Sequence, residues 1–112
     1  MLLDVSGEDL RKQLFHIKKT LKGGPKSILY IEIYDDSMLL VYRNIELPVK
    51  IFNPSGTKHK LISVYTIKNY ALLYKLINTF KNMDIYQFDF YPNFIKIKIE
   101  TSQVMIKAEI YK

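Results

Sequence analysis

The sequence predicts an α+β fold in two layers, with an antiparallel-rich sheet and two helices on one side of it. Two segments have the apolar spacing of amphipathic helices, and the segments between them alternate apolar and polar residues as half-buried strands do. The elements follow one another as β-α-β-β-β, and the same order then repeats. Two helices would cover the apolar face of such a sheet, so we expect a single domain over residues 1–112.

The first predicted repeat spans about residues 1–52 and begins with a short strand over 2–5. A helix should follow over 8–22, because Ser6 can accept hydrogen bonds from the free amides of its first turn. A Gly-Gly-Pro sequence at 23–25 should end it, since glycine permits the left-handed stop and proline breaks the helix. The apolar stripe of this helix consists of Leu10, Leu14, Ile17 and Leu21.

Three strands complete the first repeat, over residues 29–34, 38–43 and 45–51, each with alternating apolar side chains. Pro48 lies in the third of them and cannot donate a backbone hydrogen bond. That strand should therefore lie at a sheet edge or contain a bulge.

The second predicted repeat spans about residues 58–112 and follows an Asn-Pro-Ser-Gly turn at 53–56. We expect Thr66 to cap its helix, which should extend over 67–81. The predicted buried face of this helix consists of Tyr70, Leu73, Tyr74, Leu76, Ile77 and Phe80. The predicted strands of this repeat cover 61–65, 86–90, 95–100 and 104–112.

Composition excludes several classes of function. The chain has no cysteine, which removes disulfides, thiolate zinc sites and cysteine nucleophiles. Its two histidines lack metal-ligand spacing, and no catalytic or nucleotide-binding motif is present, so we expect no enzyme activity, no metal and no cofactor. No signal peptide or membrane span is recognisable, which predicts an intracellular protein: cytoplasmic in a prokaryote or its virus, nuclear in a eukaryote.

The positive charge is concentrated in the predicted helices. Eight basic residues against two acidic ones in these helices account for the whole net charge of +6, while the other segments are neutral. Lysines on the outer face of a helix often serve solubility alone, but such faces usually mix both signs of charge. A surface of one sign is the arrangement that meets a phosphate backbone without reading base sequence.

The repeated β-α-β-β-β order with a pair of basic helices resembles one domain of the DNA sliding clamps, the polymerase processivity factors of DNA replication. The segment DIYQFDFYPNFIKIKIE at 84–100 is similar to the strand pair that follows the second helix in that family. The resemblance covers essentially the whole chain. It implies a non-enzymatic protein that binds double-stranded DNA non-specifically and tethers replication or repair partners.

In sliding clamps, the helices line the hole of a ring and carry the Lys and Arg side chains that contact phosphates. The residues of this chain that the resemblance assigns to that role are Arg11, Lys12, Lys18, Lys19, Lys22, Lys68 and Lys75. Clamp chains carry two or three such domains, whereas this chain has one, so a ring would need about six copies. The family's groove for partner peptides lies beside a linker that is absent here, and no groove residue is assigned.

Two alternatives remain open at this point. The chain could be a small protein-interaction module, of viral or mobile-element origin, that pairs an exposed strand edge with a protein partner. Alternatively, strand aromatics could stack on bases of a single strand, although alternating aromatics more often belong to a core. These aromatics are Tyr30, Tyr34, Phe88, Phe90 and Tyr91.

We also expect self-association. The segment 104–112 reads as a long strand without proline or glycine to protect its edge, and such edges recruit another strand, here one such as 61–65 of a second copy. The predicted contact residues of this homo-oligomer are Val104, Ile106, Ala108 and Ile110.

Overall fold

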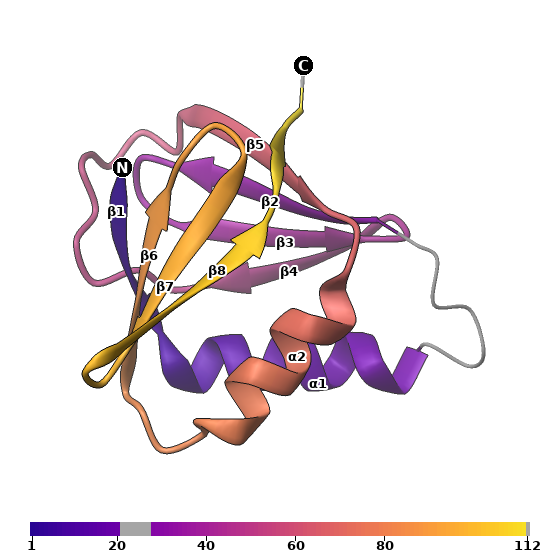
Figure 1. The fold of residues 1–112 in the computed structure, drawn as a ribbon. Coiled ribbons are helices and arrows are strands. Elements are labelled where there is room, and N and C mark those ends of the chain that lie inside the picture. Colours follow the sequence, from indigo (N-terminus) through magenta and orange to yellow (C-terminus); the bar gives the residue numbers. More distant parts are fainter. Residues whose placement is uncertain (21–27, 112) are drawn as a thin grey trace.

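The computed structural model describes residues 1–20 and 28–111 and confirms the α+β class, with two helices and two antiparallel sheets (Figure 1). The predicted end of the first helix and its Gly-Gly-Pro stop, residues 21–25, lie outside the described residues. In chain order the elements are β1 (Leu2–Ser6), α1 (Gly7–Thr20), β2 (Leu29–Tyr34), β3 (Met38–Tyr42), β4 (Ile45–Val49), β5 (Leu61–Ile67), α2 (Tyr70–Thr79), β6 (Ile85–Phe90), β7 (Phe94–Ile99), β8 (Ser102–Lys107) and β9 (Glu109–Ile110).

The strands form two sheets rather than one continuous sheet, with the orders β1-β6-β7-β8 and β4-β3-β2-β5-β9. Each sheet contains the last three strands of one repeat and the first strand of the other, because β1 pairs with β6 and β5 pairs with β2. The repeats therefore exchange their first strands. Apart from the added β9, the two repeats are equivalent in topology, as the repeated element order predicts.

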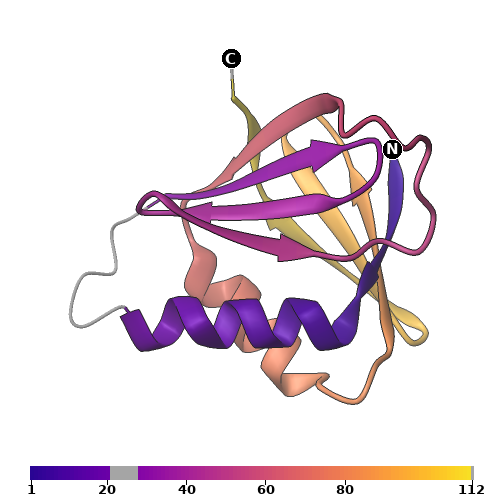
Figure 2. The same ribbon diagram turned by 180° about the vertical axis from the view of Figure 1, so that it is seen from behind.

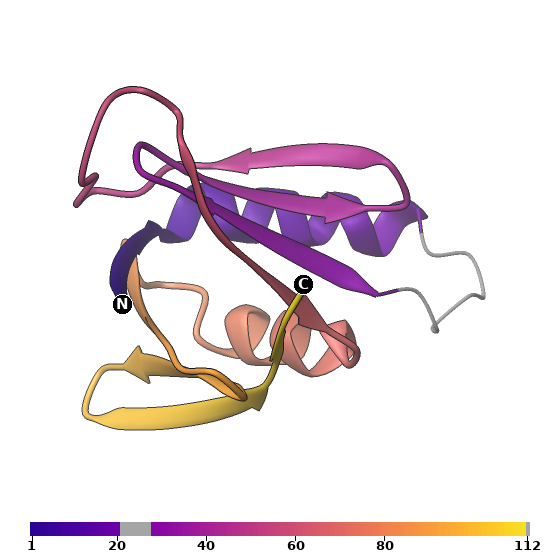
Figure 3. The same cartoon turned by 90° about the horizontal axis from the view of Figure 1, so that it is seen from above.

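Both helices lie together on one side of the molecule, beneath the two sheets, and the view from behind shows the same arrangement (Figures 1 and 2). Seen from above, the two sheets diverge from each other, with a helix next to each of them (Figure 3). One core fills the space between these layers, and Leu10 and Leu14 of α1 are buried in it with Leu73 and Ile77 of α2.

The second helix is shorter than predicted. It begins at Tyr70 rather than at residue 67, because Ile67 is still paired with Leu29 in the sheet and is buried there. Thr66 is a β5 residue and not the cap. The cap is Asn69, whose side-chain oxygen accepts a hydrogen bond from the backbone N–H of Leu72 at 3.3 Å.

The C-terminal strand is also different from the prediction. It divides at Ala108 into β8, which pairs with β7, and β9, which pairs with β5 in the other sheet. Strand β5 therefore already has neighbours on both sides at Tyr65 and Thr66. The prediction that Pro48 marks an edge is confirmed, since β4 is the outermost strand of its sheet.

Candidate nucleic-acid interface

Helix α1 presents most of the predicted phosphate contacts. Ser6 caps it by accepting a hydrogen bond from the N–H of Asp9 at 3.2 Å, as the sequence predicted. Lys12, Lys18 and Lys19 are exposed on the outer side of the helix. Lys18 and Lys19 occupy its last turn, where positive charge also stabilises the helix by interacting with the helix dipole.

Helix α2 contributes less charge than predicted because it is short. Lys75 is its one basic residue, and it is exposed. Lys68 precedes the helix and Lys81 follows it, both exposed, so they flank α2 rather than belong to it. Lys22 lies outside the described residues.

Arg11 has a different role from the lysines. Its side chain is half-buried and donates hydrogen bonds to the backbone carbonyl of Met83 at 2.7 Å and to the hydroxyl of Tyr86 at 3.3 Å. These bonds join α1 to the segment that enters β6. The guanidinium is therefore engaged within the protein, which makes Arg11 a structural cation beside the exposed lysines.

The exposed lysines of the helices form no ion pairs with acids within residues 1–20 and 28–111, where the two ion pairs are Met1–Asp89 and His59–Asp36. Two of these lysines instead lie over aromatic rings. The Nζ atom of Lys18 lies 4.6 Å from the ring centre of Tyr74, and that of Lys19 lies 4.9 Å from the ring centre of Phe15. Among the described residues, the exposed lysines of this side thus have no partner of opposite charge.

A groove of about 410 Å³ runs between the two helices. Buried Leu14 and Ile77 lie against it, and Phe15, half exposed at 50%, lies beside it. No acidic residue is among the described side chains that line it. The lining consists of Arg11, Lys12, Leu14, Phe15, Tyr74, Ile77, Asn78, Lys81 and Asn82.

Sequence reasoning missed this groove, although the sequence contained a signal for it. Phe15 follows Leu10 by five residues, which places it about 140° around the helix from the apolar stripe and among the lysines. An aromatic side chain at that position does not serve the core. It indicates a surface that offers both an apolar ring and positive charge.

The predicted oligomer edge is divided between two environments. Ile106 and Ala108 are buried, Val104 is half-buried, and Ile110 is exposed in β9, opposite Tyr65. The side chains of Ile106 and Ala108 are therefore part of the core, whereas that of Ile110 remains accessible.

The backbone of β8 nevertheless has a free side. The N–H of Ala108 bonds to the carbonyl of Asn93, so by alternation the backbone groups of Met105 point away from β7. No other strand pairs with this side of β8 in the described part of the chain. Met105 is 65% exposed there.

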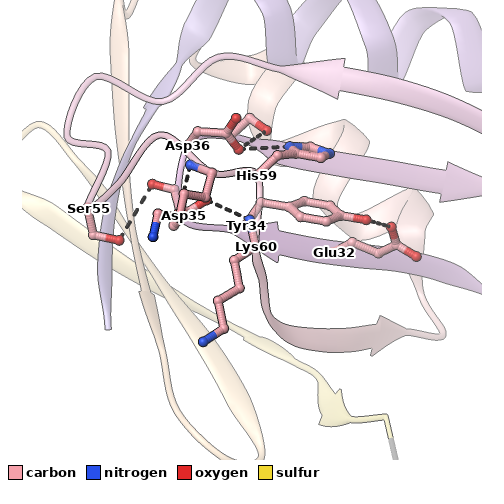
Figure 4. A network of polar contacts seen from close by, with 9 residues as sticks. Glu32, Tyr34, Asp35, Asp36, Ser55, His59 and Lys60 are labelled. Carbon is pink, nitrogen blue, oxygen red and sulfur yellow. Dashed lines mark hydrogen bonds and ion pairs between the residues drawn. The ribbon is translucent and has the colours of Figure 1, made fainter.

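A second cluster of polar residues lies at the β2–β3 turn and the loop before β5 (Figure 4). The Nδ1 atom of His59 donates to the carboxylate of Asp36 at 2.8 Å, and its ring stacks on Tyr34 with ring centres 4.1 Å apart. The carboxylate of Asp35 accepts from the backbone N–H of Lys60 at 2.8 Å and of Lys58 at 3.3 Å. His59 is thus paired with Asp36, although its side chain remains exposed.

These contacts change two pKa values. The hydrogen bond from His59 holds the pKa of Asp36 below its ordinary value, and the hydrogen bond from Tyr34 to Glu32 at 2.7 Å raises the pKa of Tyr34 to about 12. The carboxylates of Asp35 and Asp36 both accept hydrogen bonds from the loop before β5. The cluster therefore stabilises the connection between the two repeats.

Residues 1–20 and 28–111 contain no group of three His, Cys, Asp or Glu side chains that could hold a metal ion. No helix in this part of the chain has both the length and the apolar character that crossing a membrane requires. The strand aromatics do not offer a stacking surface as a set, since Phe88 and Phe90 are buried in the core and Tyr34 already stacks on His59.

Comparison with known proteins gives no match to a family model, to a curated protein or to a solved structure. The resemblance to sliding clamps therefore remains a hypothesis based on sequence pattern.

Proposed function

We propose that this protein is a non-enzymatic, clamp-like factor that binds DNA non-specifically through its helical side and tethers replication or repair partners there. The proposal rests on the unpaired positive charge of the two helices as the structure describes them. Exposed lysines of α1 and α2, two helices that lie together on one side of the molecule, have no acidic partner among the described residues. The residues we assign to phosphate contacts are Lys12, Lys18, Lys19 and Lys75, with Lys68 and Lys81 at the ends of α2.

The physics of such contacts defines the function. A lysine that neutralises a phosphate releases a condensed counterion, so affinity falls steeply as salt is added. Lysine carries no information about the base, so binding should be independent of sequence. A protein that binds in this way can remain on DNA while moving along it, which is what a tether for a polymerase or a repair enzyme requires.

The test compares two variants with the same loss of charge. Lys12, Lys18 and Lys75 are changed together to Gln in one, and Lys58, Lys60 and Lys98, which lie outside the helices, are changed to Gln in the other. Glutamine removes the charge and keeps the helical propensity. Binding of a labelled 20-base-pair duplex is measured by fluorescence anisotropy over a series of salt concentrations.

We expect the helix variant to lose at least about tenfold in affinity and to show a shallower salt dependence, because about three phosphate contacts are removed. The control variant should lose much less. Equal losses in the two variants would mean that only net charge matters, and no binding by the unchanged protein at low salt would refute the proposal.

A second candidate function is pairing of the β8 edge with another strand, either of a second copy or of a partner protein. The observation that favours it is the free backbone side of β8 at Met105. Met105→Pro removes the outward N–H without affecting the bonds to β7, and Met105→Thr keeps it. A mass by light scattering that exceeds one chain, and that falls to one chain only in the proline variant, would support edge pairing; a single-chain mass for the unchanged protein would refute self-association.

A further inference from the structure

The groove between α1 and α2 contains three kinds of group that rarely occur together on a solvated surface. Phe15 exposes half of its ring, and the ring of Tyr74 lines the groove beneath the ammonium group of Lys18. Arg11, Lys12 and Lys81 supply positive charge, while Asn78 and Asn82 supply amide donors and acceptors. The volume of about 410 Å³ is within the range of sites that hold small molecules.

This combination matches one kind of ligand. Proteins that hold single-stranded nucleic acid place aromatic rings, on which bases stack, along a positively charged groove that follows the backbone. Here the Nζ atom of Lys19 lies over one face of the Phe15 ring, 4.9 Å from the ring centre. A base therefore stacks on the other face of this ring, and Lys19 can turn to the phosphate of the same nucleotide. The absence of acidic side chains from the lining removes repulsion of phosphate.

We infer that the groove between α1 and α2 binds an unstacked base of a single-stranded nucleic acid, with Phe15 as the stacking surface. The adjacent phosphates contact Lys12, Lys18 and Lys19. This inference rests on the proposed function, since it assigns the same helical side to a more specific ligand. A duplex keeps its bases stacked and paired, so it can use the lysines but not the groove.

Single strands should bind more tightly than duplexes, and only the affinity for single strands should depend on Phe15. Phe15→Ala should weaken binding of a labelled oligo-dT of about 12 nucleotides by about tenfold and leave duplex binding unchanged. Phe15→Trp should restore the affinity for the single strand, since its ring stacks at least as well. Phe52→Ala is the matched control, because Phe52 is 48% exposed but lies in the connection after β4 rather than in the groove.

An abasic oligonucleotide of the same length separates stacking from charge. It retains every phosphate, so it should bind more weakly than oligo-dT and should be insensitive to Phe15→Ala. Equal binding of the two oligonucleotides, or equal effects of Phe15→Ala and Phe52→Ala, would overturn the inference. Circular dichroism melting of each variant checks that it is folded, and the half-exposed position of Phe15 makes a large loss of stability unexpected.

The failure of this inference is distinguishable from the failure of the proposed function. If the duplex binds in a lysine-dependent way but Phe15→Ala changes nothing, the groove assignment alone is wrong. If neither nucleic acid binds at low salt, the proposed function fails as well. Binding of an acidic peptide that contains phenylalanine, lost in Phe15→Ala and accompanied by no binding of oligo-dT, would assign the groove to a protein ligand and refute the inference.

Discussion

The two repeats have the same topology but hold their helices differently. In the first repeat, the carboxylate of Asp9 accepts from the N–H of Lys50 at 2.9 Å, and the amide of Gln13 donates to the carbonyl of Pro48 at 2.9 Å. These side chains of α1 form hydrogen bonds to backbone groups of the edge strand β4 and of the residue just after it. In the second repeat, α2 makes no such bond to β8 among the described residues. The space between them is a groove of about 320 Å³ that Leu72, 46% exposed, lines together with buried Ile106.

The edges of the sheets show the same contrast. The outer side of β1 is covered by the segment that follows β4. The backbone N–H of Ser6 donates to the carbonyl of Lys50, and the backbone N–H of Phe52 donates to the carbonyl of Asp4, both at 2.8 Å. The edge strand β4 contains Pro48, whereas β8 has neither a proline nor a covering segment among the described residues. The first repeat has its edges covered by its own chain or marked by proline, and the second leaves the edge of β8 accessible to a partner.

The largest expected effect is at the point where the two repeats meet. Gly7 begins α1 and donates to the carbonyl of Asp84 at 2.8 Å, and a Cβ atom at Gly7 would lie 2.1 Å from the backbone carbonyl oxygen of Met83. Gly7→Ala should therefore lower the free energy of unfolding by about 3 kcal/mol, because backbone atoms must move apart. Urea unfolding measures the loss. A loss below 1 kcal/mol would show that the first repeat can shift relative to the second.

Removal of the hydroxyl of Tyr86 should have the next largest effect. This buried hydroxyl accepts from Arg11 of α1 and donates to the carbonyl of Phe80 at the end of α2, so it joins both helices to β6. Tyr86→Phe should cost about 1–3 kcal/mol of stability because it leaves these groups without a partner. Arg11→Met should cost less in the Tyr86→Phe background than in the unchanged protein. Additive losses in chemical denaturation would mean that the two side chains act independently.

The two helix caps test whether the repeats differ locally as well as in their packing. Ser6→Ala and Asn69→Ala each remove one side-chain acceptor from the first turn of a helix, at 3.2 Å and 3.3 Å from its amide. Each should cost about 1 kcal/mol. Thermal melting compares the two. A loss in Asn69→Ala below about 0.3 kcal/mol would contradict the assigned start of α2.

The connection between the repeats should make stability depend on pH. The pKa of Asp36 is lowered in the folded protein by the hydrogen bond from His59, so the folded state binds this proton less tightly than the unfolded state. The contribution is fully present above the ordinary pKa of about 3.8 and is lost as the pH falls through the lowered value. Asp36→Asn should thus reduce stability at about pH 6 and have a smaller effect at about pH 2.5. An effect that is equal at both pH values in urea titrations would rule out this linkage.

The smallest effect is expected from Tyr42→Phe, which makes the same chemical change as Tyr86→Phe but in the first repeat. The hydroxyl of Tyr42 is buried and has no hydrogen-bond partner among residues 1–20 and 28–111, so its removal should change stability by less than about 0.5 kcal/mol or increase it slightly. A loss as large as that of Tyr86→Phe in parallel unfolding curves would mean that a water molecule satisfies this hydroxyl.

The sequence by itself determined the local features of this protein. Ser6 caps α1 because a serine hydroxyl can reach the free amides of the first turn whatever lies beyond. The alternation of apolar residues set the strands β2, β3 and β7, and Pro48 marked β4 as an edge. The lysines of α1 lie outside because its apolar stripe must face the core. Each of these depends on residues within one or two turns of helix or one strand.

Only the tertiary structure decided the features that depend on distant partners. Thr66 and Asn69 can both cap a helix, and Asn69 does so because pairing with Leu29 keeps Ile67 in the sheet. Arg11 resembles the neighbouring lysines in sequence, yet the carbonyl of Met83 draws it inward. The exchange of first strands and the crossing of the chain from β8 to β9 likewise depend on pairings between residues far apart in sequence. Local sequence sets period and dihedral preference, whereas the partner of a hydrogen bond or an apolar face is fixed only when the whole chain has folded.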